Sequence, residues 1–446
     1  MLFLIIFLLI SAYVVIFKRK YSLYYFFVVY PILPDYFAIE LGGGLPLLKS
    51  SRILILLMAV FILIYQRGKI YIDINSLKKT KMLIPLFIYF VGRITANAFY
   101  CFNLSAAMNT EFSIIFEQLI LVIILLQVIK SKQQIKQCMK ALACGSAISA
   151  IVSIISIICG KNLFYYLNTV SRSMLMASTV RMGIVRAEAG FGHPVYYGVY
   201  CALVIPICYY LYENEKKKIY ILICFLNIIA LLFTESRGSI AALIFMFAVV
   251  LIKMDGKRRR KLFRGLFIVL MVGSIISLLI PSLTQQITNI FKSMFAIMNT
   301  NIEIDDFGGN STTGLDSRLI QFTGVLWTIM NNAFFGLGAS CHTRGVLKYY
   351  KESIGWFETT TIDNGFVGYF VQEGILGTVG FCTLLVSIIR LSNKFSNKKD
   401  KSNINNVFVI CFLVYLVEMF SVADSSQVFW LIIILFLKYN SLERLK

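Results

Sequence analysis

The 446-residue sequence is 58% hydrophobic and 15% charged, with a formal net charge of +21. Soluble globular domains average about 25% charged residues, so this composition excludes an ordinary soluble enzyme. The apolar residues form long runs, and runs of about 20 apolar residues are typical of membrane-spanning helices. The basic residues cluster between these runs and no nucleic-acid-binding motif is present, so the charge indicates membrane topology and no nucleic acid partner.

The apolar runs predict an all-α, polytopic transmembrane helix bundle of about 12–14 spans. The first run has neither a basic start nor a small-residue cleavage site, so we expect it to remain as a span. The second contains Pro31 and Pro34, so we expect it to be broken or re-entrant. The predicted spans are 2–17, 23–39, 53–65, 83–100, 114–129, 141–159, 194–212, 219–233, 239–252, 265–280, 366–389, 407–420 and 428–437.

Basic residues gather in alternate connecting segments, which predicts the orientation of the chain. Such segments remain in the cytoplasm, so we expect the N-terminus outside and the C-terminus inside. One long hydrophilic stretch follows residue 280 on the expected outer side. We therefore divide the chain into a transmembrane bundle (1–280), a large extracytoplasmic loop with an interfacial helix (281–363) and C-terminal transmembrane helices (364–446).

The ten cysteines are scattered, mostly within apolar runs, and show no Cys-x-x-Cys spacing. Neither a disulfide framework nor a metal site is therefore expected, and we interpret the cysteines as small core residues. Nucleotide-binding, serine-hydrolase and zinc-protease motifs are absent from the sequence, so we expect no cofactor.

Two expected outer segments carry basic residues against the topology rule. They are residues 160–192, which include Arg186, and residues 281–363, which include Arg318. Long loops cross the membrane regardless of charge, so tolerance or simple interfacial anchoring is one interpretation. The other is that these arginines bind an anionic ligand. Apolar residues recur at helical spacing from Leu319 to Met330, which predicts a helix lying in the outer interface.

Three helices expected to begin on the outer side have unusual first residues. Pro194 suits the first helical position. Ser236 is the expected N-cap of a later helix, and Arg237 follows it where the helix dipole already favours an anion. Asp363 precedes the third helix, either as its cap or as a functional carboxylate. We expect Arg186, Arg237, Arg318 and Asp363 to converge near the outer membrane surface, an arrangement that suits a diphosphate.

These segments resemble the O-antigen ligase and polymerase superfamily of WaaL-like and Wzy-like membrane glycosyltransferases. The resemblance covers roughly Arg186 to Gly380, and the order of the motifs around the single large loop is its most specific feature. The matching motifs are Arg186 with Gly190-Phe191-Gly192-His193-Pro194, Thr234-Glu235-Ser236-Arg237-Gly238, Ser317-Arg318, Phe335-Gly336-Leu337-Gly338, Asp363-Asn364-Gly365-Phe366 and Gln372-Glu373-Gly374-Ile375-Leu376-Gly377.

The resemblance implies a GT-C-type glycosyltransferase of the bacterial cytoplasmic membrane. Its donor and acceptor would be undecaprenyl-diphosphate-linked glycans, and a flippase and a chain-length regulator are the expected protein partners. Ligases of the superfamily often carry histidine before the asparagine of the Asp363-Asn364 motif. The aspartate here favours a polymerase that builds a cell-surface polysaccharide such as O-antigen or capsule.

Within this family framework, Arg237 and Arg318, together with Arg186, are expected to neutralise the departing diphosphate. Asp363 is the expected base that accepts the proton of the acceptor hydroxyl, and His193 is the alternative.

Glu373 is a carboxylate on an apolar helix. It is expected either to orient the acceptor or an arginine, or to be the structural partner of an arginine.

Two other functions stay open. A ligase would transfer finished glycan to another acceptor in one step, whereas a polymerase would produce a ladder of repeats. A lipid-linked glycan flippase or transporter usually has internal repeats, and none is apparent here. Arg93 and Glu117 lie within predicted spans, where they would either form a charged pathway or pair inside the bundle; we favour pairing.

Overall fold

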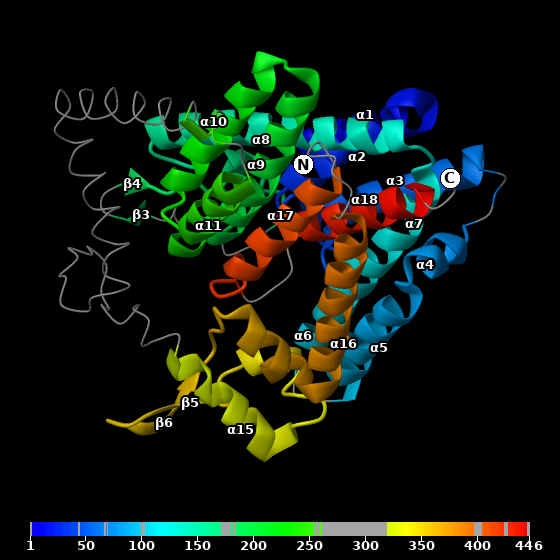
Figure 1. Ribbon diagram of the computed structural model, residues 1–446. Coiled ribbons are helices and arrows are strands. Elements are labelled where there is room, and N and C mark those ends of the chain that lie inside the picture. Colours follow the sequence, from blue (N-terminus) through cyan, green and yellow to red (C-terminus); the bar gives the residue numbers. More distant parts are fainter. Residues whose placement is uncertain are drawn as a thin grey trace.

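The apolar runs fold into helices in a computed structural model of the chain (Figure 1). It describes residues 2–42, 45–66, 68, 70–99, 103–170, 180–181, 184–253, 256, 259–260, 319–396, 404–422 and 427–443. The predicted span 265–280 and Arg318 lie outside these residues.

Most predicted spans coincide with helices to within a few residues. The helices before residue 159 are α1 (Leu2–Phe17), α2 (Arg19–Val29), α3 (Ser50–Tyr65), α4 (Ile74–Thr80), α5 (Leu83–Phe99), α6 (Leu104–Ser113), the π-helix η2 (Ile114–Ile120), α7 (Leu121–Val128) and α8 (Lys132–Ile158); α4 and α6 were not among the predicted spans. The later helices are α9 (Pro194–Glu215), α10 (Lys218–Phe233), α11 (Arg237–Lys253), α15 (Thr323–Asn332), α16 (Gly365–Ser396), α17 (Ile404–Glu418) and α18 (Gln427–Glu443).

The remaining described elements are short. Three antiparallel hairpins pair β1 (Ala38–Ile39) with β2 (Leu48–Lys49), β3 (Val180–Arg181) with β4 (Ile184–Val185), and β5 (Leu347–Lys351) with β6 (Gly355–Thr359). The 3-10 helices are η1 (Tyr30–Ile32), η3 (Leu163–Leu167) and η4 (Ala339–His342).

Helical length and composition confirm an all-α membrane protein. Within the described residues, four helical stretches are long and apolar enough to cross a membrane: Leu104–Val128, Lys132–Ile158, Pro194–Glu215 and Gly365–Ser392. Six shorter apolar helices accompany them, including α1, α3 and α10. The total number of spans and the orientation of the termini stay predictions.

The second predicted span is interrupted, as expected from its prolines. Helix α2 ends at Val29, and the 3-10 turn η1 begins with Tyr30-Pro31. Leu33 then adopts an extended conformation before Pro34, in agreement with the restriction that proline imposes on the residue before it. The chain thus leaves the helix early and continues as the irregular segment that leads to β1.

Glycines allow α5 and α16 to pack closely, and Figure 1 shows the two helices side by side. A Cβ atom at Gly92 would be 2.9 Å from the carbonyl oxygen of Leu376, and one at Gly380 would be 2.9 Å from the Cα of Tyr89. Small residues at helix crossings are typical of membrane bundles, because they let the backbones approach.

Helix α18 was predicted as the shortest span, yet it is among the most buried helices. Its residues from Val428 to Leu437 are all at most 1% exposed. A helix that is apolar and buried on every face lies at the centre of a protein rather than against solvent or lipid. We conclude that α18 is a central helix of the bundle.

The segment before α16 forms a small separate core. Helix α15, the β5–β6 hairpin and η4 pack around Leu337, Cys341 and Leu347. On the opposite face of this unit, the apolar residues predicted to lie in the interface are exposed: Leu319 60%, Phe322 46%, Leu326 57%, Ile329 51% and Met330 61%. An exposed apolar row is what a helix lying on a lipid surface requires.

Candidate active site

The segment before α9 is bound to the turn that connects α10 and α11. The Nε of Arg186 donates a hydrogen bond to the carbonyl oxygen of Thr234 at 2.8 Å, and the amide of Ala187 donates to the carbonyl of Phe233 at 2.9 Å. Two of the family-like motifs, distant in sequence, therefore form one surface.

Each of these two segments contains a non-glycine residue in the left-handed backbone region. Ala189 has φ 46° and Glu235 has φ 49°. Such residues cost about 1–3 kcal/mol each and are found mainly where the surrounding structure forces them, often at functional sites. Both residues are buried, so packing holds the two turns in these conformations.

The first turn of α11 is capped as predicted. The amide of Ser239 donates to the Oγ of Ser236 at 3.4 Å, which is the geometry of an N-cap. Arg237 is then the first residue of α11, and its side chain is partly buried. The partly positive end of a helix and a guanidinium thus share one location, and both attract an anion.

A buried carboxylate that the sequence analysis did not select lies behind this helix end. The Oγ of Ser239 donates to Oε2 of Glu418 at 3.2 Å, and Glu418 has 0% exposure. A Cβ atom at Gly238 would be 3.4 Å from the same carboxylate oxygen. The sequence could have pointed to Glu418, because it is a glutamate at the end of an apolar helix and intramembrane carboxylates are often functional.

His193 caps α9 and faces two of the predicted site residues. Its Nδ1 accepts a hydrogen bond from the amide of Val195 at 3.3 Å, and Pro194 occupies the first turn. The pKa of His193 is lowered from 6.5 by desolvation and by the positive charge of Arg186, while the carboxylate of Asp363 acts in the opposite direction. His193 is therefore within electrostatic range of Arg186 on its own segment and of Asp363, which is distant in the chain.

Asp363 is exposed and does not cap its helix through its side chain. Asn364 has this role, because its Oδ1 accepts hydrogen bonds from the amides of Phe366 and Val367 at 3.0 and 3.3 Å. The Oδ2 of Asp363 accepts a 3.3 Å hydrogen bond from Nε2 of Gln321. The exposed carboxylate thus receives a hydrogen bond from a neutral donor, a suitable arrangement for a proton acceptor.

Gln321 is a positioning residue that sequence reasoning missed. Its Oε1 accepts hydrogen bonds from the backbone amides of Asp363 and Asn364, at 3.0 and 3.1 Å, in addition to the contact with the Asp363 side chain. It precedes α15, 42 residues before Asp363 in the chain. A glutamine within a short helical segment gives no sequence signal of such a contact.

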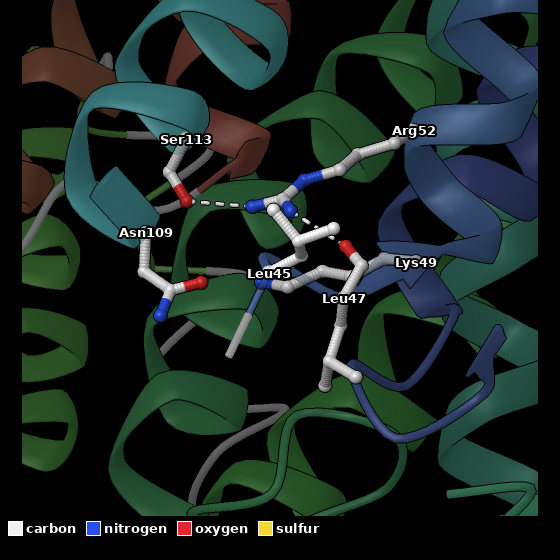
Figure 2. A pocket seen from close by; sticks show the side chains of 6 residues that line it. All are labelled: Leu45, Leu47, Lys49, Arg52, Asn109 and Ser113. Atoms are coloured by element: carbon white, nitrogen blue, oxygen red, sulfur yellow. Dashed lines mark hydrogen bonds between the residues drawn. The ribbon is translucent and has the colours of Figure 1, made fainter. Parts of the chain in front are cut away.

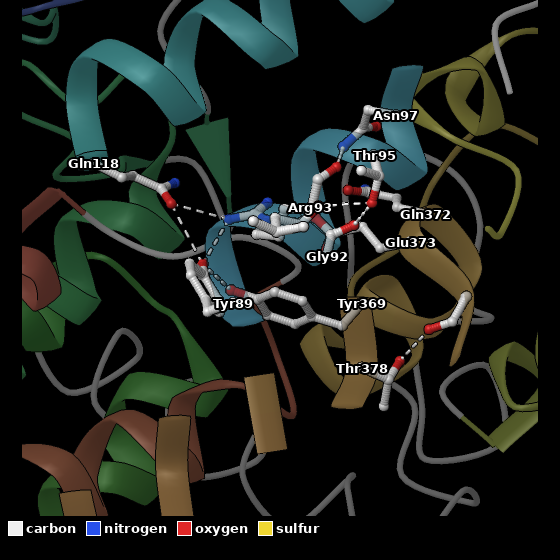
Figure 3. Close-up of polar contacts among 12 residues, drawn as sticks. Tyr89, Gly92, Arg93, Thr95, Asn97, Gln118, Tyr369, Gln372, Glu373 and Thr378 are labelled. Atoms are coloured by element: carbon white, nitrogen blue, oxygen red, sulfur yellow. Dashed lines mark hydrogen bonds and ion pairs between the residues drawn. The ribbon is translucent and has the colours of Figure 1, made fainter. Parts of the chain in front are cut away.

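Glu373 is buried in an ion pair in the α5–α16 interface (Figure 3). Its Oε1 accepts from Nε of Arg93 at 2.5 Å, and the two side chains are 1% and 4% exposed. Arg93 also donates to the Tyr89 hydroxyl at 2.7 Å and to Gln118 at 3.1 Å. These contacts favour the structural interpretation of Glu373 over an acceptor-orienting one.

The two charged residues predicted within spans do pair inside the bundle, although not with each other. Arg93 pairs with Glu373, and Glu117 accepts from Nε of Arg52 at 2.8 Å. Among the described residues, no group of three or more metal-ligating side chains occurs.

Comparison with known proteins adds one family. A family model described as O-antigen ligase matches residues 222–382, a segment that runs from α10 into α16. The matched segment includes Arg237, Arg318, Asp363 and Glu373, whereas Arg186 and His193 precede it. None of the curated proteins compared with the chain matches it.

Proposed function

We propose that the protein is a membrane glycosyltransferase. The basis is the O-antigen ligase match over residues 222–382, which assigns this part of the chain to the O-antigen ligase and polymerase superfamily. The enzyme joins oligosaccharide repeats carried on undecaprenyl diphosphate at the outer face of the bacterial cytoplasmic membrane. The structural observation that supports the proposal is the hydrogen bond from Arg186 to the carbonyl of Thr234, which holds a guanidinium close to the start of α11.

The leaving group is a lipid diphosphate, and cations lower the barrier to its departure. Arg186 and Arg237 supply guanidinium groups that match phosphate geometry, and the first turn of α11 adds its dipole. Arg318 is proposed as a third contact from the large loop. Because these cations are fixed before the reaction begins, they stabilise the negative charge as it develops.

The acceptor is a sugar hydroxyl whose oxygen attacks the anomeric carbon of the donor. The bond from that carbon to the diphosphate oxygen breaks, and the diphosphate leaves with the electron pair. The hydroxyl proton passes to Asp363, with His193 as the alternative base. Aspartate before Asn364, where ligases of the superfamily often have histidine, favours repeated addition of units over transfer of a finished chain.

The proposal is tested with purified protein in nanodiscs and lipid-linked repeat as the only substrate. The wild type is expected to produce a ladder of chain lengths, also in EDTA because arginines neutralise the leaving group. Arg237→Lys keeps the charge but loses the planar fork, so chain growth should fall at least tenfold. Arg390→Lys, at an exposed site near the other end of α16, is the matched control and should behave as the wild type.

Three outcomes would change the assignment. Single-step transfer of preformed glycan to a different acceptor would identify a ligase. Movement of lipid-linked repeat across the bilayer without any new glycosidic bond would identify a flippase. Full chain growth by Arg237→Lys would remove Arg237 from the leaving-group role.

A further inference from the structure

A second cluster of charged and polar side chains borders a cavity near the start of α3 (Figure 2). The cavity has a volume of about 330 Å³, within the range of about 300–1,000 Å³ that is usual for ligand sites. None of the catalytic roles proposed above uses it. Its walls are formed by Leu45, Leu47, Lys49, Arg52, Asn109 and Ser113.

Arg52 forms a fixed wall of this cavity. It is only 2% exposed, and three of its donors are directed at different partners. Its Nε donates to Glu117 at 2.8 Å, Nη1 to the carbonyl of Leu47 at 2.7 Å and Nη2 to the hydroxyl of Ser113 at 2.8 Å. A guanidinium held in this way is preorganised, so a ligand that binds it does not have to order it.

The charges around the cavity are balanced. Lys49 lies 2.7 Å from a carboxylate oxygen of Asp35 and 3.5 Å from one of Glu117, and Arg52 pairs with Glu117. Two cations therefore face two carboxylates, in contrast to the arginine-rich site beside α11. A cluster without net charge has no electrostatic preference for a diphosphate.

The lining of the cavity contains both hydrogen-bond donors and acceptors. The amide of Asn109 offers both, the hydroxyl of Ser113 offers both, and Lys49 and Arg52 are donors. The side chains of Leu45 and Leu47 add an apolar surface. Mixed donors and acceptors beside an apolar patch suit a sugar ring, whose hydroxyls are both donors and acceptors and whose C–H faces are apolar.

The cavity belongs to the same end of the bundle as the candidate active site. Lys49 pairs in the β1–β2 hairpin with Ala38, and the hydroxyl of Thr169, in the segment after η3, donates to the carbonyl of Ala38 at 2.7 Å. A Cβ atom at Gly190, in the segment before α9, would be 2.4 Å from the carbonyl of Ile32. The β1–β2 hairpin and the residues just before it thus connect the active-site segment with the cavity.

We propose that this cavity is a glycan subsite that binds a sugar residue of the acceptor chain. This inference rests on the proposed glycosyl transfer, in which the acceptor is itself a glycan and must be held while a new unit is added. A subsite separate from the arginine-rich site beside α11 would hydrogen-bond the hydroxyls of the glycan. The arginines of that other site would then bind only the lipid diphosphate.

The binding test uses free oligosaccharide repeat, released from lipid-linked glycan by mild acid, so that neither lipid nor diphosphate contributes. Saturation-transfer NMR and a binding titration are recorded with purified protein in nanodiscs. Asn109→Leu should weaken binding at least tenfold, and Ser113→Ala should weaken it about three- to tenfold, the usual effect of one lost hydrogen bond. Arg52 is left unchanged, because its loss would leave Glu117 buried without its main partner.

Asn214→Leu is the matched control. Asn109 and Asn214 are both exposed helix residues whose amides donate to the carbonyl four residues earlier, at 2.9 Å in each case. Asn214 lies near the opposite end of α9 from His193. This variant should bind the oligosaccharide as the wild type does.

The outcomes separate this inference from the proposed function. Oligosaccharide binding that Asn109→Leu abolishes, in a protein that transfers no sugar, would support the subsite and refute the glycosyltransferase. Normal binding and normal acceptor KM in Asn109→Leu, together with wild-type transfer, would refute the subsite alone. A phospholipid that native mass spectrometry detects on the wild type but not on Asn109→Leu would assign the cavity to a lipid headgroup and refute it as well.

Discussion

Arg186 donates from Nε to the carbonyl oxygen of Thr234 at 2.8 Å, across 48 residues of sequence. The bond orients the guanidinium and at the same time joins the segment before α9 to the turn between α10 and α11. Arg186 therefore has a geometric role in addition to the charge role proposed for it.

Replacing Arg186 with lysine separates these roles. Lysine keeps the positive charge but has no Nε–H to direct at Thr234. A charged hydrogen bond contributes about 1.5–3 kcal/mol, and about 1.4 kcal/mol corresponds to a factor of ten in rate. We expect the transfer rate of Arg186→Lys to fall about 10- to 100-fold in the nanodisc assay. A rate equal to that of Arg390→Lys would show that charge alone suffices.

The pKa of His193 should respond in opposite directions to its two charged neighbours. Arg186 lowers it and Asp363 raises it. Arg186→Gln should therefore raise the pKa and Asp363→Asn should lower it further below 6.5. The chain has two histidines, so NMR of ¹³C-labelled histidine resolves both, and His342→Gln assigns them. Shifts in the same direction in both variants would contradict the arrangement of the three residues.

If His193 is the base, the decrease of the transfer rate at low pH (the acidic limb of the pH–rate profile) follows the protonation of His193. Only the neutral imidazole accepts a proton, so activity should fall as pH decreases through the pKa of His193. In Arg186→Gln this limb should move to higher pH. An acidic limb that does not move with the NMR titration would leave Asp363 as the base.

The Arg93–Glu373 pair should matter for stability rather than for chemistry. Glu373→Gln leaves the buried charge of Arg93 without its carboxylate, and breaking a buried pair costs about 3–5 kcal/mol. We expect a clear drop in Tm for this variant, and recovery of much of it in the double variant Arg93→Leu/Glu373→Leu. An unchanged Tm with abolished transfer would instead make Glu373 a functional carboxylate.

Gly190 should not tolerate a side chain. A Cβ atom there would be 2.4 Å from the backbone carbonyl of Ile32, which cannot rotate away as a side chain can. Overpacking of this kind costs about 1–3 kcal/mol, so Gly190→Ala should lower Tm and also displace the segment that carries Arg186. Among the described residues, nothing lies within 4 Å of a Cβ atom at Gly256, so Gly256→Ala is the control. Equal Tm values for Gly190→Ala and Gly256→Ala would contradict the close approach of Gly190 to the carbonyl of Ile32.

The helices were predictable from the sequence because their signals are local. The run 2–17 coincides with α1, and Pro194 begins α9 as expected from its preference for the first turn. Boundaries were missed where polar residues extend a helix. Helix α8 begins at Lys132 rather than near 141, because Ser131 and Gln134 form a capping box within a stretch interpreted as a loop.

The site was predictable only in part, for a physical reason. Arginines and an aspartate at helix starts are visible in the sequence, and in the structure both Arg186 and Asp363 act electrostatically on His193. Partners supplied by distant segments leave no local pattern, and Gln321 beside Asp363 and Glu418 behind α11 are of this kind. The pairing of Glu373 with Arg93 likewise depends on which helices are neighbours.

The π-helical segment Ile114–Ile120 lets consecutive residues serve different partners, since Glu117 binds Arg52 while Gln118 accepts from Arg93. A π-turn holds one residue more than an α-turn, so deleting one residue there would let the segment close into a regular α-helix. The helices on either side would keep nearly the same orientation, but the side chains within the segment would be redistributed around its axis. Glu117 and Gln118 would then no longer both face their arginines, so a single deletion would disturb the Arg52 and Arg93 networks together.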